Sequence, residues 1–233
     1  MIKWSELAER SNKILKLEIP PIAIKLVRRG EEIPEGVEEY TGDPVPFCGF
    51  VGIVREERKV ISSRAHALGA CPLGLSALGF SATPEKVAKG EVDFEAGRTS
   101  SLDAARRKVG SVQRLSDIIG PGMTEAVLAA PLEKTPVDPD VIHIFGSALQ
   151  MMRIVQGLIY QEGGKAYAEF AGMQSTCSDA TVVPLITNRP NFTVQCVKSR
   201  MQCECGDWEM LAGIPGKKFE EVVTGIEKTE GKY

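Results

Sequence analysis

The sequence predicts an α/β or α+β fold, in which helices pack on a mixed sheet. Two observations support this class. Stretches rich in aliphatic and β-branched residues alternate along the whole chain with stretches of helical periodicity. The 233 residues are 43% hydrophobic and 25% charged, the composition of a globular protein with a sizeable core. We therefore expect a single domain over residues 1–233.

The first half of the chain contains several helix and strand patterns. Apolar residues at helical spacing predict a helix over 5–15, which Pro20 and Pro21 end. The remaining expectations are a core strand over 22–27, a polar loop over 28–44, a helix over 45–57 and a strand over 59–62. A segment of small residues follows, and Pro72 suits the first position of a helix, so Cys71 is predicted at a helix N-terminus.

The clearest pattern of the second half is the strand over 141–145 and the helix after it. Ser147 is the predicted N-cap of that helix, and Gly163 and Gly164 end it. Its apolar face is predicted to comprise Leu149, Met152, Val155 and Ile159. The other predicted elements are helices over 101–119, 177–186 and 217–228 and strands over 126–131, 166–170 and 192–200.

The two halves share a weak internal similarity that suggests pseudo-symmetry. Aligning Cys71 with Cys177 also matches Ile53 with Ile159, Glu56 with Glu162, Lys59 with Lys165, Ala65 with Ala171 and Pro84 with Pro190. The order of helix, strand, loop and cysteine repeats as well. A duplication covering about 45–90 and 151–196 would place the two cysteines on equivalent helix starts.

Charge and hydropathy exclude two classes of partner. The net charge is −3, and the basic residues Arg106, Arg107, Lys108 and Arg114 are interpreted as the solvated face of a helix. Nucleic-acid binding is therefore not expected. The most apolar stretch, 141–160, is interrupted by polar residues, so no membrane association is expected. The N-terminal residues lack the apolar core of a signal peptide, and the expected location is the cytoplasm.

Six cysteines carry most of the functional information: Cys48, Cys71, Cys177, Cys196, Cys203 and Cys205. In a reducing compartment they indicate metal or catalytic chemistry, or simple burial, rather than disulfides. Paired Cys-x₂₋₄-Cys knuckles for zinc are absent, and so is the Cys-x-x-Cys of thioredoxin-like proteins. One hypothesis is a ligand set from distant segments, in which Cys48, Cys71, Cys177 and Cys196 hold a 4Fe-4S cluster.

Two alternatives from other classes stay open. The first is a module that binds a small anionic ligand at the helix N-termini of Cys71 and Cys177. The second is a thiol enzyme that uses Cys71, with His66 nearby in the sequence. His143 lies in an apolar strand and is interpreted as a hydrogen-bonded core residue.

Several short motifs, in this order, resemble the domain-of-unknown-function 169 family of archaeal and bacterial proteins. They include Pro20 to Lys25, Phe47-Cys48, Cys71 with Leu78-Gly79-Phe80, Pro131-Leu132-Glu133, Pro139 to Ile142, Gln150 to Tyr160, Cys177 with Pro184, Cys196 before Arg200, Glu209-Met210 and Gly213-Ile214-Pro215. The resemblance implies cysteines at the positions of Cys48, Cys71, Cys177 and Cys196, while Cys203 and Cys205 are additions of this chain.

The resemblance leaves the reaction unassigned, but it favours the cluster hypothesis. A redox or electron-transfer role would require a redox partner, and Arg200, Arg64 and Lys59 are candidate cations for an anionic substrate.

Overall fold

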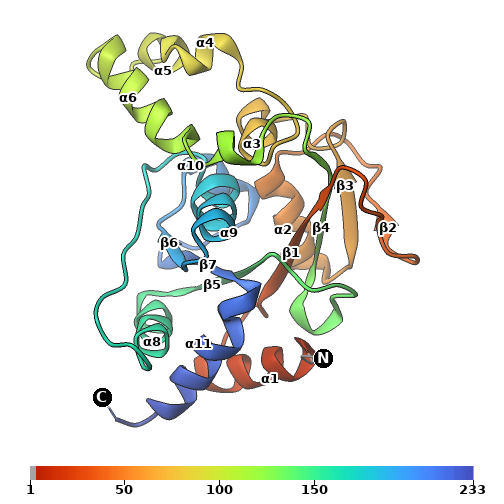
Figure 1. Cartoon of the computed structure of the whole chain (residues 1–233), viewed down its shortest axis with the longest axis vertical. Coiled ribbons are helices and arrows are strands. Elements are labelled where there is room, and N and C mark those ends of the chain that lie inside the picture. Colours follow the sequence, from red (N-terminus) through yellow and green to blue (C-terminus); the bar gives the residue numbers. More distant parts are fainter. Residues whose placement is uncertain (1–3, 233) are drawn as a thin grey trace.

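The computed structural model describes residues 4–232, and its centre is one seven-stranded sheet (Figure 1). The strands are β1 (Ile22–Arg28), β2 (Glu38–Glu39), β3 (Ile61–Arg64), β4 (Thr124–Pro131), β5 (Val141–Ser147), β6 (Asn191–Thr193) and β7 (Glu209–Pro215). Their order is β2-β3-β4-β1-β5-β7-β6. The pair β2 and β3 is parallel and the other pairs are antiparallel, so the predicted mixed sheet with helices is confirmed.

Helices connect the strands and cover the sheet. They are α1 (Trp4–Leu15), α2 (Phe47–Glu57), α3 (Pro72–Ala77), α4 (Glu85–Ala88), α5 (Glu91–Glu95), α6 (Leu102–Gln113), α7 (Ser116–Ile119), α8 (Ala148–Leu158), α9 (Val183–Thr187), α10 (Val197–Gln202) and α11 (Gly216–Lys228). A 3₁₀-helix, η1 (Leu132–Lys134), and a π-helix, η2 (Ser175–Val182), complete the set.

The two faces of the sheet carry separate apolar cores. Along β1, Ile22, Ile24 and Leu26 contribute to one core and Ala23 to the other, as alternation along a strand requires. The first core packs α2, η2 and α9 on the sheet, and the second packs α1, α8 and α11 (Figure 1).

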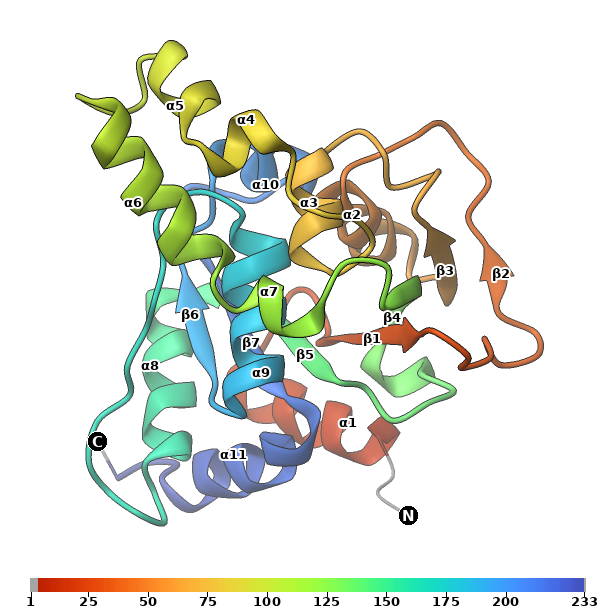
Figure 2. The ribbon, with the colours of Figure 1, turned by 45° about the horizontal axis from the view of Figure 1, so that its top comes forward.

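Helices α4, α5 and α6 form a cap that projects from one end of the molecule (Figure 2). Ser101 begins α6 because its hydroxyl accepts a hydrogen bond from the Ala104 amide, at 3.1 Å. The predicted helix over 101–119 is wrong in one respect, because it is divided into α6 and α7.

Three further predicted elements differ in the structure, and the predicted loop over 28–44 contains the short strand β2. Residues 166–170 form no strand, and the predicted strand over 192–200 is limited to β6, after which the chain turns into α10. The predicted helix over 177–186 begins earlier, as the π-helix η2, so Cys177 is its third residue rather than its start. In the two segments considered for a duplication, α2 corresponds to α8, but no strand of the second segment corresponds to β3.

Helix α8 begins as predicted, but it ends at Leu158, before the predicted Gly163, and it turns a different face inward. Ser147 and Gln150 form a reciprocal capping box at its start. Leu149 is 67% exposed, whereas Met151 and Ile154 are buried. The reason is the crossing with α11: at Gly157 and Gly225 a Cβ atom would collide with the backbone of the facing helix, so this glycine face lies against α11.

Candidate functional site

A cavity of about 890 Å³ lies where α2, α3, η2 and α10 meet the cap. All four cysteines predicted as ligands, Cys48, Cys71, Cys177 and Cys196, line it. They come from four segments that are far apart in the sequence, and the fold brings them to one place.

Each of these cysteines lies at or near the start of a helical segment. Cys71 is the N-cap residue of α3 and Cys196 that of α10, while Cys48 is the second residue of α2. Cys177 lies in the first turn of the π-helix, a helix type that is rare and frequent at functional sites. At these helix starts the Cys196 sulfur accepts a hydrogen bond from the Ser199 amide, whereas the Cys71 side chain makes no cap hydrogen bond.

Two of the thiols are buried, and burial governs their protonation. The pKa of Cys48 is raised to about 11, first by burial and then by the neighbouring thiols of Cys196 and Cys71. The pKa of Cys177 is also raised well above its usual value. Burial is the main cause, and the neighbouring Cys48, Cys71 and Cys196 thiols add to it. The four thiols thus interact electrostatically, and the raised pKa values of Cys48 and Cys177 favour their protonated forms at neutral pH.

Ser199 provides polar contacts to the outer part of the cluster of thiols. Its hydroxyl lies 3.2 Å from the Cys196 Sγ, and its amide donates to the same sulfur at 3.5 Å. A hydrogen bond from Ser199 also favours the charged form of Cys48. Hydrogen bonds to sulfur stabilise a thiolate, so Ser199 is placed to tune two of the four groups.

Two further contacts fix the segments that carry the cysteines. The Gln174 amide nitrogen donates to the Leu73 carbonyl at 2.8 Å, and its oxygen accepts from Gln113 of α6 at 3.0 Å. The Lys198 ammonium donates to the Ala70 carbonyl at 3.0 Å, which joins α10 to the loop before Cys71. The cap and the cysteine-bearing segments are therefore connected directly.

The cap contributes charged groups that the sequence did not indicate. Asp93 is 5% exposed and pairs with Arg98 at 2.9 Å and Lys108 at 3.0 Å, and all three line the cavity. Burial opposes the ionisation of Asp93, but hydrogen bonds from both cations lower its pKa. The interpretation of Lys108 as part of a solvated face is wrong, since α6 folds back over the cavity.

The three cations considered for an anionic substrate lie elsewhere. Arg64 pairs with Glu39 and Lys59 with Glu57 near the surface. Arg200 donates to the carbonyls of Val194, Glu209 and Gly206, so it holds the loop after α10. None of the three lines the cavity, which instead contains Arg98, Lys108 and Lys198.

The two histidines also lie outside the cavity lining. His143 is fully buried, and its Nε2 lies 3.1 Å from the Ala180 carbonyl and 2.9 Å from the Thr181 hydroxyl. Burial lowers its pKa to about 3, so it is neutral at physiological pH. The prediction that it is a hydrogen-bonded core residue is confirmed.

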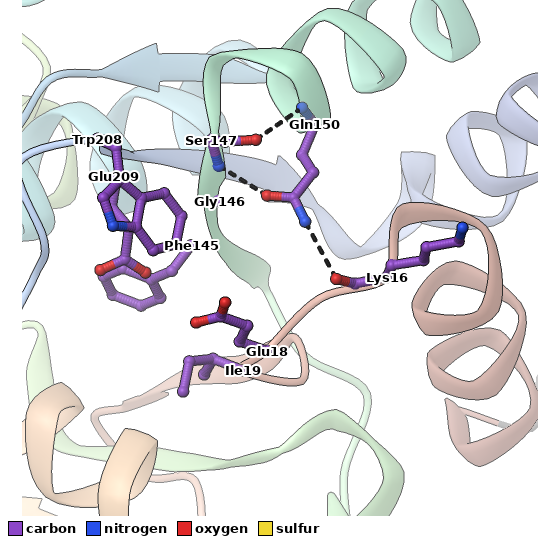
Figure 3. Close-up of a pocket in the computed structure, with 9 residues that line it drawn as sticks. All are labelled: Lys16, Glu18, Ile19, Phe145, Gly146, Ser147, Gln150, Trp208 and Glu209. Carbon is purple, nitrogen blue, oxygen red and sulfur yellow. Dashed lines mark hydrogen bonds between the residues drawn. The ribbon is translucent and has the colours of Figure 1, made fainter.

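A second cavity, of about 320 Å³, lies near the start of α8 (Figure 3). Its wall includes the capping box, in which Gln150 accepts from the Ser147 amide and donates to the Lys16 carbonyl (Figure 3). Phe145, Trp208 and Glu209 form the opposite wall. The bonds of Gln150 hold α8 against the chain that leaves α1, so these contacts serve the fold.

Among residues 4–232 no group of three or more His, Cys, Asp or Glu side chains is arranged to hold a metal ion. No helix of this range has both the length and the apolar character needed to cross a membrane.

Comparisons with known proteins assign a family but no activity. The model of a family described as Uncharacterised ArCR, DUF169, matches residues 12–225. The uncharacterized protein MJ0308 of Methanocaldococcus jannaschii is 31% identical over 227 residues, which cover 96% of this chain and 94% of that protein. No solved structure matches. The family resemblance predicted from the short motifs is confirmed.

Proposed function

This chain belongs to the DUF169 family, and from that premise and the geometry of its thiols we propose that it binds a 4Fe-4S cluster through Cys48, Cys71, Cys177 and Cys196. The observation that carries the proposal is the shared cavity: four cysteines from four separate segments line it together. Simple burial of free cysteines would not require them to meet at one site.

The donor set suits an iron–sulfur cluster. Four cysteine thiolates are the usual ligands of such clusters, and soft thiolate ligands select them among metal centres. A single zinc ion would need all four sulfurs about 2.3 Å from one point. Here the four thiols line a cavity of about 890 Å³, and among residues 4–232 no group of side chains is arranged to hold one ion, which favours a larger guest.

Electrostatics also favours a cationic guest. The pKa values of Cys48 and Cys177 are raised because burial and neighbouring thiols disfavour several thiolates in one cavity. Iron would offset both effects, and binding would release the thiol protons. Loading of the site should therefore be more favourable at higher pH.

A bound cluster would supply one-electron redox chemistry, with a potential set by hydrogen bonds to sulfur and by exposure. Ser199 supplies such hydrogen bonds at Cys196. Cys71 and Cys196 are partly exposed, and Val197 and Met201 are 77% and 70% exposed at the same cavity wall. This exposed apolar edge gives a redox partner a short approach to the thiols.

The test is anaerobic purification and reconstitution, followed by an absorption spectrum and iron and sulfide analysis of the same sample. We expect a brown protein with about four iron and four sulfide per chain. Serine at any of the four positions should abolish or strongly reduce this loading. The matched control is Cys205→Ser, which alters a cysteine outside the cavity and should leave the loading unchanged.

The alternatives give other outcomes. A protein that stays colourless and metal-free after reconstitution contradicts the proposal. If a small anion then binds and the single serine variants retain that binding, the site is an anion-binding module. If the protein has an activity that only the Cys71→Ser substitution abolishes, the protein is a thiol enzyme.

A further inference from the structure

Two cysteines outside the cavity form a second thiol site, at the turn Cys203-Glu204-Cys205 after α10. Cys203 is fully buried, whereas Cys205 is partly exposed. The Cys205 Sγ lies 3.4 Å from the Arg55 Nη1 and 3.1 Å from the Gln195 Nε2, and both nitrogens donate to it. Two donors directed at one partly exposed sulfur are an arrangement that stabilises a thiolate.

The Arg55 guanidinium is held in place from two other sides. Its Nη2 donates to both carboxylate oxygens of Glu209, at 3.0 and 2.9 Å. Its central carbon, Cζ, lies 4.8 Å from the centre of the Phe145 ring. Because these contacts hold the planar group, its Nη1 stays directed at Cys205.

The backbone around this sulfur is strained at two positions. Gln195 and Glu204 adopt left-handed conformations, with φ of 68° and 49°. For residues other than glycine this conformation is unfavourable, because the Cβ atom comes close to the following carbonyl oxygen. One strained residue carries the amide donor and the other joins the two cysteines, and such strain concentrates at functional sites.

The charges around Cys205 favour its ionised form. The pKa of Cys205 is lowered to about 7, first by its hydrogen bond with Cys203 and, against the effect of burial, by Gln195 and the Arg55 charge. The nearby Glu209 carboxylate opposes this effect but is itself paired with Arg55. Cys205 therefore ionises more readily near neutral pH than an ordinary thiol does.

We propose that Cys205 and Cys203 form a dithiol site that reduces low-molecular-weight disulfides, with Cys205 as the nucleophile and Cys203 as the resolving thiol. The Cys205 thiolate attacks one sulfur of the disulfide RS–SR, forms the mixed disulfide Cys205–S–SR and releases RS⁻. Cys203 then attacks the Cys205 sulfur and its proton goes to the departing group, which leaves as RSH. The chain loses two electrons in the new Cys203–Cys205 bond, and the small disulfide gains them.

The burial of the two sulfurs matches these roles. The partly exposed Cys205 can be reached by a small disulfide, while Cys203 is fully buried beside it. The Cys203 thiol also donates to the Cys48 carbonyl at 3.2 Å, which keeps it on the inner side of its partner. The resolving attack thus comes from within, and the small thiol departs toward solvent.

The experiment is a stopped-flow reaction of the full-length chain with the aromatic disulfide 5,5′-dithiobis(2-nitrobenzoate) at pH 7 under argon. The double variant Cys71→Ser/Cys196→Ser removes the other partly exposed thiols within residues 4–232. We expect the release of two aromatic thiolates per chain, and peptide mapping should find a Cys203–Cys205 disulfide. Because the pKa of Cys205 is lowered to about 7, the first thiolate should be released several times faster than by the thiols of the urea-unfolded chain.

Two variants in this background separate the roles. Cys203→Ser should release one thiolate and retain a stable mixed disulfide on Cys205, and Cys205→Ser should lose the rapid reaction. The proposal is wrong if Cys205→Ser keeps the rapid reaction, or if wild-type mapping finds no Cys203–Cys205 bond. Iron content plays no part in these readouts, so they are independent of the proposed cluster.

Discussion

The buried ion pair between Arg55 and Glu209 allows a quantitative prediction about stability. Their side chains are 10% and 4% exposed, and three hydrogen bonds reach the Glu209 carboxylate: two from Arg55 and one from the Gly206 amide at 2.8 Å. The substitution Arg55→Met retains an apolar stem but removes two of these bonds and the compensating charge. The carboxylate would then be buried with one donor, which costs about 3–5 kcal/mol in the free energy of unfolding.

The assay is urea-induced unfolding followed by circular dichroism at pH 7, with Glu209→Gln and the double variant Arg55→Met/Glu209→Gln as partners in a mutant cycle. Glutamine can still accept the Gly206 hydrogen bond, and the double variant buries no unpaired charge. It should therefore recover at least about 2 kcal/mol relative to Arg55→Met alone. An Arg55→Met loss below about 1 kcal/mol, or a double variant as unstable as Arg55→Met, would refute the reasoning.

Two further predictions concern stability. The pKa of His143 is about 3 in the folded chain and 6.5 when unfolded, so its contribution is present above pH 6.5 and is lost as the pH falls toward 3. Between pH 6.5 and 4.5 this loss amounts to about 2 kcal/mol in the free energy of unfolding. Urea unfolding at both pH values should show this loss in the wild-type chain but not in His143→Gln. Equal losses in the wild type and the variant would contradict the assignment. At the crossing of α8 and α11, Gly225→Ala would place a Cβ 2.1 Å from the Gly157 carbonyl oxygen and should cost more than about 2 kcal/mol. The matched control Gly110→Ala lies in helix α6 with nothing within 4 Å and should stabilise by about 0.5–1 kcal/mol; similar thermal midpoints for the two variants would exclude the steric explanation.

Local patterns predicted several elements of the fold well. The apolar run at 22–27 became β1, the run at 141–145 became the core of β5, and Ser147 became the cap of α8. In each case the signal was contained within a few neighbouring residues. The inward face of α8 was predicted wrongly, because the close approach at Gly157 and Gly225 depends on a helix that lies far along the chain.

The candidate site was predictable in its chemistry but not in its geometry. Free cysteines with no local partner indicated a ligand set from distant segments, and that reasoning selected Cys48, Cys71, Cys177 and Cys196. No local signal indicated the π-helix around Cys177 or the return of α6 over the cavity, which brings Arg98 and Lys108 to its wall. The dithiol turn was visible as Cys203-Glu204-Cys205, but its donors Arg55 and Gln195 come from other segments.

The sequence alone determined which groups this protein has for chemistry and which segments form its central strands, because residue type and local periodicity decide both. The tertiary structure decided that four cysteines share one cavity while the other two lie behind it beside a buried guanidinium. Convergence of this kind depends on the order of the strands and the packing of helices on both faces of the sheet. Those long-range contacts arise only when the whole chain buries its apolar surface together.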